Sequence, residues 1–268
     1  HGVRVTASRL AAALRLDPGA VTFEKLRVDA LDGVFLGRAR LAGYRRLSVE
    51  GALSGFSISA LGRLRVETAR IPWSGRVSGP VKLDAGISAT RIEGARVDAE
   101  LVVSPEDGAR PMEGQVTLSY DQKDGWLRFA DSRLRTPATR VEFSGALGQR
   151  LDFDLRTTDL GDPLAAAAAF SENAPASLPV SLENGSSSFR GSVEGWLDAP
   201  RIAGRAAAAN FRYEKRLFQR LDAEVDLTPA ALRVRSLALE RDGARVEGRG
   251  EIALAGWKPA ETSPFSAS

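Results

Sequence analysis

The chain has 268 residues, of which 43% are hydrophobic and 26% are charged, a composition typical of a folded protein with a large apolar surface. It has no cysteine, and its single histidine is His1, which excludes disulfides, cysteine-based metal sites and histidine-dependent catalytic triads. The net charge of +3 comes from 37 basic and 34 acidic residues that are interspersed along the chain. Nucleic-acid binding is not expected, because it requires a clustered basic face.

The N-terminal segment predicts a short helix at residues 6–14, where hydroxyl residues precede an Ala- and Leu-rich run, followed by a turn at Asp17-Pro18-Gly19. From Val21 onward apolar and polar residues alternate, which predicts β-strands with one apolar and one charged face. Strands are expected at residues 21–28, 34–41, 47–56, 76–83, 97–103, 115–120, 126–129, 140–147 and 151–155, with three or four within 66–104. Asp32-Gly33 predicts a hairpin turn, and residues 58–64 predict one short helical turn.

The alternation stops after Leu155. Asp162 to Phe170 predicts a helix, because a capping residue and a proline precede an alanine run. Residues 173–188 are rich in Pro, Ser, Asn and Gly and predict a linker, after which the strand pattern resumes at Phe189. The residues after Trp257 are polar and are expected to be frayed. The total is about sixteen strands with one or two short helices.

An internal repeat supports a sheet that grows by addition of similar units. Residues 73–79 (WSGRVSG) are echoed by residues 189–195 (FRGSVEG), and residues 140–145 (RVEFSG) by residues 245–250 (RVEGRG), in the same order. The expected segments are an N-terminal β segment (1–65), a first β unit (66–160), a helix and linker (161–188), a second β unit (189–258) and a polar tail (259–268).

No catalytic grouping stands out, so an enzyme is not expected. The carboxylate groups of Asp152/Asp154 and of Asp222/Glu224/Asp226 lie on the polar face of strands, where solvated charge is normal. Residues 248–253 match G-x-G-x-x-A, but the β pattern runs through them, whereas a dinucleotide site needs a strand followed by a helix. No cofactor or metal is expected. The four tryptophans, Trp73, Trp126, Trp196 and Trp257, are interpreted as packing residues near segment ends.

No signal peptide or transmembrane helix is apparent, because the longest apolar run, Leu164 to Phe170, is far shorter than the roughly 20 residues of a membrane span. The chain begins with His rather than Met, and we expect it to be a fragment of a longer protein.

Several motifs together resemble the TamB-like proteins of the AsmA-like superfamily. Residues 191–195 (GSVEG) with 199–204 (APRIAG) resemble the G-x-v-x-G…P-x-i-x-G signature of that family. The glycine-rich strand ending at residues 254–257 (LAGW) and an earlier segment at 69–155 are similar to it as well, so the resemblance covers residues 20–258. It implies an all-β fold, a long curled antiparallel sheet that is open along one side as a groove with an apolar concave face.

The resemblance also implies a function in the cell envelope. Proteins of this family are anchored in the inner membrane, cross the periplasm, and are implicated in phospholipid passage to the outer membrane and in outer-membrane biogenesis and protein secretion as part of the translocation and assembly module. The implied partners are phospholipid acyl chains and, through parts of the parent chain absent here, an outer-membrane barrel protein.

The residues expected to line the groove are the alternating apolar ones. They are Val97, Leu101, Leu118, Phe129, Val141, Phe143, Leu151, Phe153, Leu155, Val225, Leu227, Val234, Leu239, Ile252 and Leu254. The same alternation also fits a closed sandwich whose faces cover each other. The alternative hypothesis is therefore a structural or adhesive β-scaffold of the cell envelope, such as an autotransporter-like stalk, with a closed side-chain core.

Overall fold

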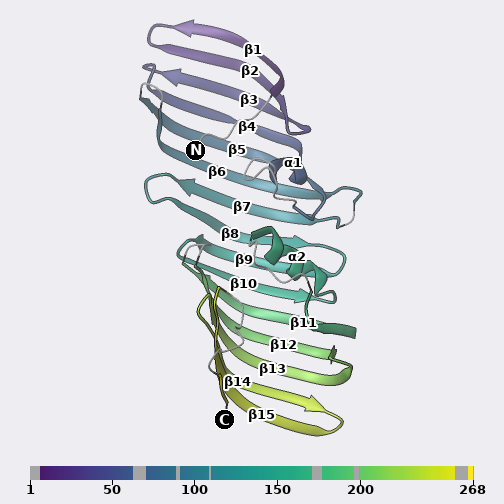
Figure 1. Cartoon of the computed structure of the whole chain (residues 1–268). Coiled ribbons are helices and arrows are strands. Elements are labelled where there is room, and N and C mark those ends of the chain that lie inside the picture. Colours follow the sequence, from purple (N-terminus) through teal and green to yellow (C-terminus); the bar gives the residue numbers. More distant parts are fainter. Residues whose placement is uncertain are drawn as a thin grey trace. The chain divides into compact units, whose positions relative to one another are not determined.

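A computed structural model describes residues 7–62, 71–88, 91–108, 110–170, 177–195, 199–256 and 265–267 (Figure 1). The chain divides into two compact units, unit 1 (His1–Pro137) and unit 2 (Ala138–Ser268). Each unit is built of antiparallel strands in sequence order with one short helix.

Unit 1 is an antiparallel meander in which each strand pairs with the next along the chain. Its strands are β1 (Ala7–Asp17), β2 (Ala20–Ala30), β3 (Gly33–Ala42), β4 (Arg46–Ser57), β5 (Gly75–Ser88), β6 (Arg91–Pro105), β7 (Glu113–Asp121) and β8 (Trp126–Arg135). Helix α1 (Ile58–Gly62) lies in the connection from β4 to β5. Within the described residues no pairing joins β8 back to β1, so the sheet of unit 1 stays open.

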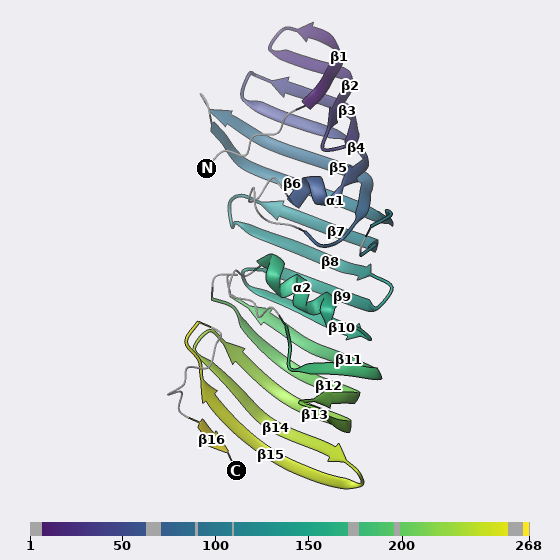
Figure 2. The same cartoon turned by 45° about the vertical axis from the view of Figure 1, so that its right-hand side comes forward.

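Unit 2 repeats this plan. Its strands are β9 (Thr139–Leu147), β10 (Arg150–Thr157), β11 (Val180–Glu194), β12 (Arg201–Tyr213), β13 (Arg216–Thr228), β14 (Ala231–Arg241), β15 (Ala244–Ala253) and β16 (Phe265–Ala267). Helix α2 (Gly161–Phe170) connects β10 to β11. The strands pair with their sequence neighbours only, as far as the structure describes them, and those from β11 to β15 are visibly curved in Figure 2.

The predicted fold class is confirmed: both units are open antiparallel sheets with short helices. The expected helical turn at 58–64 is α1, and the expected helix at 162–170 is α2. The hairpin predicted at Asp32-Gly33 turns through Leu31 and Asp32, which both have positive φ, as a tight two-residue hairpin requires.

The helix predicted at residues 6–14 is wrong, because these residues belong to β1. Leu10, Leu14 and Leu16 pair with Val28, Phe23 and Val21 of β2. Helix propensities differ by less than about 1 kcal/mol per residue, so a ladder of cross-strand hydrogen bonds outweighs them.

Two predicted strand boundaries are also wrong. In both places glycines that were expected to end a strand lie at β-bulges inside longer strands. The described part of residues 66–104 holds two long strands, β5 and β6, in place of three or four, with a register shift between Asp84 and Gly86. The linker predicted at 173–188 is in part strand, because β11 begins at Val180 and continues through a register shift at Asn184-Gly185.

The C-terminal tail is also more ordered than predicted, because Phe265–Ala267 forms β16. Trp196, Trp257 and residues 259–264 of the predicted tail lie outside the described residues.

The best-buried apolar cluster of unit 1 lies beneath α1. Phe56, Ile58, Val77 and Val103 form it, and they are 6–8% exposed. Leu53 and Leu101 pack against the cluster from the neighbouring part of the sheet. One end of the sheet face is therefore covered by a helix (Figures 1 and 2).

Two phenylalanine rings lie flat across paired glycines. In unit 1, Gly37 and Gly51 are opposite each other in register, and a Cβ atom on either would lie within 2.7 Å of Phe35 Cζ. In unit 2, Phe189 lies across the paired glycines Gly191 and Gly204 in the same way. Glycine is needed at these four positions because a side chain would collide with a backbone carbonyl oxygen and with the ring.

We therefore expect Gly51→Ala to lower the free energy of unfolding by about 1–3 kcal/mol, the range for inserting a methyl group into a filled site. The new Cβ would meet Phe35 Cζ at 2.6 Å and the Leu36 carbonyl oxygen at a shorter distance. Urea denaturation measures the change. The matched control is Ala52→Val, at the adjacent exposed position on the other face, which should change stability by less than about 0.5 kcal/mol. Equal effects of the two substitutions would contradict this account of the glycines.

Candidate functional site

One face of unit 1 is apolar from β2 to β8. Cross-strand partners point to the same side of a sheet, and apolar residues pair with apolar residues from strand to strand. The main residues of this face are Val21, Phe23, Val28, Phe35, Leu41, Leu47, Val49, Leu53, Val77, Val81, Leu83, Val97, Leu101, Leu118 and Phe129. We call them the apolar face of unit 1.

Unit 2 carries a face of the same kind. Phe143 pairs with Phe153, Val193 with Ile202, and Leu221 with Leu239. The apolar face of unit 2 consists of Val141, Phe143, Leu151, Phe153, Leu155, Phe189, Val193, Ile202, Leu221, Val225, Leu227, Val234, Leu237, Leu239 and Ile252. The rings of Phe153 and Phe189 stack with centroids 5.2 Å apart, so they continue the flat surface over the glycines.

The side chains of these two faces are not fully buried, unlike the side chains of a closed core. Most of their residues are only half-buried, and within the described part of the chain the only side chain less than 2% exposed is Ser132. Closed cores contain several fully buried Leu, Ile or Phe residues. The half-burial comes from neighbours in the same layer, which leaves the outer side of each face accessible except beneath the helices.

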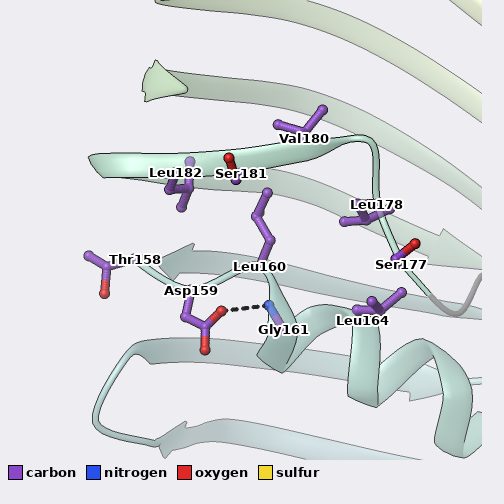
Figure 3. Close-up of a pocket in the computed structure, with 10 residues that line it drawn as sticks. All are labelled: Thr158, Asp159, Leu160, Gly161, Leu164, Ser177, Leu178, Val180, Ser181 and Leu182. Atoms are coloured by element: carbon purple, nitrogen blue, oxygen red, sulfur yellow. Dashed lines mark hydrogen bonds between the residues drawn. The ribbon is translucent and has the colours of Figure 1, made fainter. Parts of the chain in front are cut away.

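A pocket of about 340 Å³ lies in unit 2 where α2 begins and β11 begins (Figure 3). Leu160 points across it toward the residues of β11. The carboxylate of Asp159 accepts a hydrogen bond from Gly161 N–H at 2.8 Å and so caps the start of α2. The full lining is Thr158, Asp159, Leu160, Gly161, Leu164, Ser177, Leu178, Val180, Ser181 and Leu182. This lining holds no group of converging acids and bases, and Leu182 pairs with Phe211, so the pocket borders the apolar side of the sheet.

The opposite face of each sheet is covered by ion pairs between strands. In unit 1, Glu50 of β4 accepts a 2.7 Å hydrogen bond from Arg38 of β3 and lies 3.7 Å from the Lys82 ammonium of β5. The Arg38 guanidinium holds the pKa of Glu50 below its ordinary value. In unit 2, Asp154 pairs with Arg190 across the β10–β11 ladder. These pairs fix which face of each strand meets water, although each exposed pair stabilises by less than about 1 kcal/mol.

The best-buried of these carboxylates is Asp226 of β13. Arg201 donates two hydrogen bonds to it, at 2.9 and 2.5 Å, and Arg235 donates a third at 3.0 Å. Hydrogen bonding by Arg201, with a smaller part from Arg235, lowers the pKa of Asp226 from 3.8 to about 2 in spite of burial. Because these residues belong to β12, β13 and β14, this cluster joins three strands.

The predicted groove residues fall on both apolar faces. Val97, Leu101, Leu118 and Phe129 belong to unit 1, and the others to unit 2. All except Leu254 lie in strands; Leu254 follows β15 and donates its N–H to the Ala230 carbonyl at 2.8 Å. The sequence prediction missed the apolar residues of β1 to β4 and the aromatic–glycine contacts of Phe35 and Phe189. The recurrence of Phe-x-Gly at 35–37 and 189–191 could have indicated those contacts.

The other motifs are placed as strand residues. Residues 248–250 lie in β15, and Asp152, Asp154 and Asp222 all pair with arginines on the polar face. No group of three or more His, Cys, Asp or Glu side chains with metal-binding geometry occurs among the residues that the structure describes. None of the described helices is long and apolar enough to cross a membrane.

Comparison with family models, curated proteins and solved structures found no match to the chain. The resemblance to TamB-like proteins therefore stays a prediction from the sequence motifs.

We expect Asp226→Asn to cost about 2 kcal/mol at pH 7, the value of a shift of nearly two pKa units, since Arg201 and Arg235 lose their shared anion. The folded-state pKa lies below the unfolded one, so this contribution is present above about pH 4 and is lost as the pH falls toward 2. Urea denaturation at pH 7 and at steps down to pH 2 measures both effects. Asp242→Asn is the matched control, because Asp242 is 70% exposed in its ion pair. A parent protein and D226N variant of equal stability at pH 7 would refute the role of Asp226.

Proposed function

We propose that this chain is a segment of a TamB-like, periplasm-spanning protein anchored in the inner membrane, whose apolar sheet faces carry phospholipid acyl chains toward the outer membrane. The observation that carries the proposal is the apolar face of each unit, which runs from strand to strand and whose side chains stay partly exposed. Large exposed apolar surfaces mark binding sites on soluble domains.

The physical requirements of an acyl chain match such a face. A chain needs only a continuous apolar surface, and each buried methylene contributes about 0.8 kcal/mol. The rings of Phe35 and Phe189 lie flat over their glycines. Because these four glycines have no side chain, nothing projects from the apolar surface around each ring. The proposed role needs neither a catalytic residue nor a metal.

The proposed place in the cell follows from the same family resemblance. The parent protein would contribute to outer-membrane biogenesis and protein secretion, and its contact with an outer-membrane barrel protein would involve parts outside this sequence. The alternative, a structural or adhesive scaffold of the envelope, requires the apolar faces to be covered by protein. The open sheets support the conduit over the scaffold, because nothing covers these faces beyond the helices and their adjoining segments in the described part of the chain.

The test is lipid content. The chain purified from a diderm bacterium should release phospholipid into organic extracts, detected by mass spectrometry. Phe153→Asp places a charge on the apolar face of unit 2 and should abolish most of the loading there, while the sheet stays folded because the carboxylate can reach water. Ser188→Asp is the matched control: it adds the same charge on the polar face, opposite Arg156 in register.

Circular dichroism melts separate the two hypotheses. A folded F153D variant with reduced lipid agrees with the conduit. A parent chain without lipid, together with an F153D variant that unfolds, would favour the scaffold and defeat the proposal.

A further inference from the structure

Strand β1 is the outer strand of the sheet of unit 1. It pairs with β2 on one side, and none of the elements that the structure describes pairs with its other side (Figures 1 and 2). Successive residues of a strand direct their N–H and C=O groups alternately to the two sides, so about half of these groups in β1 point away from β2. An edge of this kind is a template for a further strand.

The apolar side of β1 is exposed as well. Its leucines pair in register with three residues of β2 that belong to the apolar face of unit 1, so they lie on the same side of the sheet. Leu10, Leu14 and Leu16 are 70%, 58% and 70% exposed, whereas their partners in β2 are only partly exposed. Exposed apolar side chains that lie next to one another mark an interaction surface.

The segment from Arg9 to Asp17 lacks the features that protect most edge strands. It contains no proline and no lysine. It also contains no bulge of its own, because the extra residue at Ser8 comes before it and the register shift between Ala11 and Ala13 adds its extra residue to β2. Edge strands are commonly protected from pairing by such features, so this segment is a regular strand that is open to a partner.

The charges of this segment are complementary to the same segment in the opposite direction. When Ala13 lies opposite Ala13 of a second copy, Arg9 of each copy lies opposite Asp17 of the other. Asp17 accepts an ion pair from Arg15 of its own strand at 3.3 Å and is still 42% exposed, so a second arginine can reach it. The self-pairing therefore forms two ion pairs between the copies.

The apolar residues match in the same register. Leu10 lies opposite Leu16, and Ala12 lies opposite Leu14. The two-fold axis of an antiparallel pair is perpendicular to the sheet, so both copies keep their leucines on the same side. Cross-strand partners of this kind cover each other, which would bury the three exposed leucines of each copy.

Neighbouring registers do not give this match. A shift of one residue places the leucines of one copy on the charged side of the other. A shift of two residues places Arg9 opposite Arg15 in one direction and opposite Gly19, in the turn, in the other. Like charges opposite each other are destabilising, so the register centred on Ala13 is favoured.

We propose that β1 pairs with β1 of a second copy of this chain, in an antiparallel two-fold arrangement centred on Ala13. Residues 9–17 of the two copies form roughly eight to ten backbone hydrogen bonds. The apolar faces of the two unit 1 sheets then continue into each other across the pairing. This inference goes beyond the proposed lipid binding and does not depend on it.

The first test measures the oligomeric state of the whole chain. Sedimentation velocity over a range of protein concentrations should show a monomer–dimer equilibrium. Leu14→Lys should weaken dimerisation about a hundredfold, because two leucines are lost from the interface and two charges are placed beside the axis. The matched control is Val246→Lys on β15, which adds the same charge at an apolar position that is 60% exposed and should leave dimerisation unchanged. Circular dichroism verifies that both variants fold.

The second test exchanges the charges. R9D places acids opposite acids and D17R places bases opposite bases, so each variant alone should dimerise about tenfold more weakly. An equal mixture of the two variants should recover the parent's affinity, because every acid then faces a base. The double variant R9D/D17R should recover it too. A variant that had merely lost its fold would not be rescued in this way.

The third test reports the register. The chain contains no cysteine, so a single cysteine can form a disulfide only with a second copy. Ala13→Cys faces itself across the axis and should form a covalent dimer on mild oxidation. Ala11→Cys is the matched control on the same side of the strand. Its two copies are four residue steps or about 14 Å apart, whereas a disulfide needs Cα atoms within about 7 Å.

The outcomes separate this proposal from the others. A chain that stays monomeric, or a dimer that L14K leaves intact, would overturn the pairing through β1. Covalent dimers of A11C in place of A13C would overturn the register. A monomer that floats with phosphatidylglycerol vesicles, but not when Leu14 is replaced, would show that the leucines contact a membrane instead of a second copy. A monomer that still releases phospholipid would refute the dimer and leave the proposed function standing.

Discussion

The antiparallel register is the constraint on which the rest of this structure depends. Successive side chains of a strand point to opposite faces, so a shift of one residue would move a whole apolar set to the charged side. In both units the register keeps apolar residues opposite apolar residues from strand to strand, as in the Phe143–Phe153 pair. Where one extra residue enters, as at Gly94, or two, as at Asn184, a bulge restores the register within a few residues.

Charge and glycine placement support that register from opposite faces. On the polar face, Glu50 and Asp226 each contact basic side chains of both neighbouring strands, which favours one alignment of three strands at a time. On the apolar face, Phe35 and Phe189 each need two opposed glycines. A misaligned pairing would separate the ions and place side chains under the rings, so both features select the same sheet.

The pattern of residues was sufficient to predict the class of fold and most strands, because period-two alternation has few interpretations over ten residues. It predicted the apolar residues of β6 to β10 and β13 to β15 as members of one kind of face. It failed at β1, where Leu10 and Leu14 read equally well as a helix, and at β11, where Ser186 to Ser188 read as a linker. In both cases the decisive interaction was the pairing with a neighbouring strand, which no local window contains.

The alternation of side chains by itself determined that each strand has one apolar and one charged face, since that property belongs to the extended backbone. It left open whether those faces would meet each other, because a sandwich and an open sheet need the same alternation. Only the tertiary structure shows that the sheets are open. In it each strand pairs with its neighbours in sequence, and α1 covers only one end of a face.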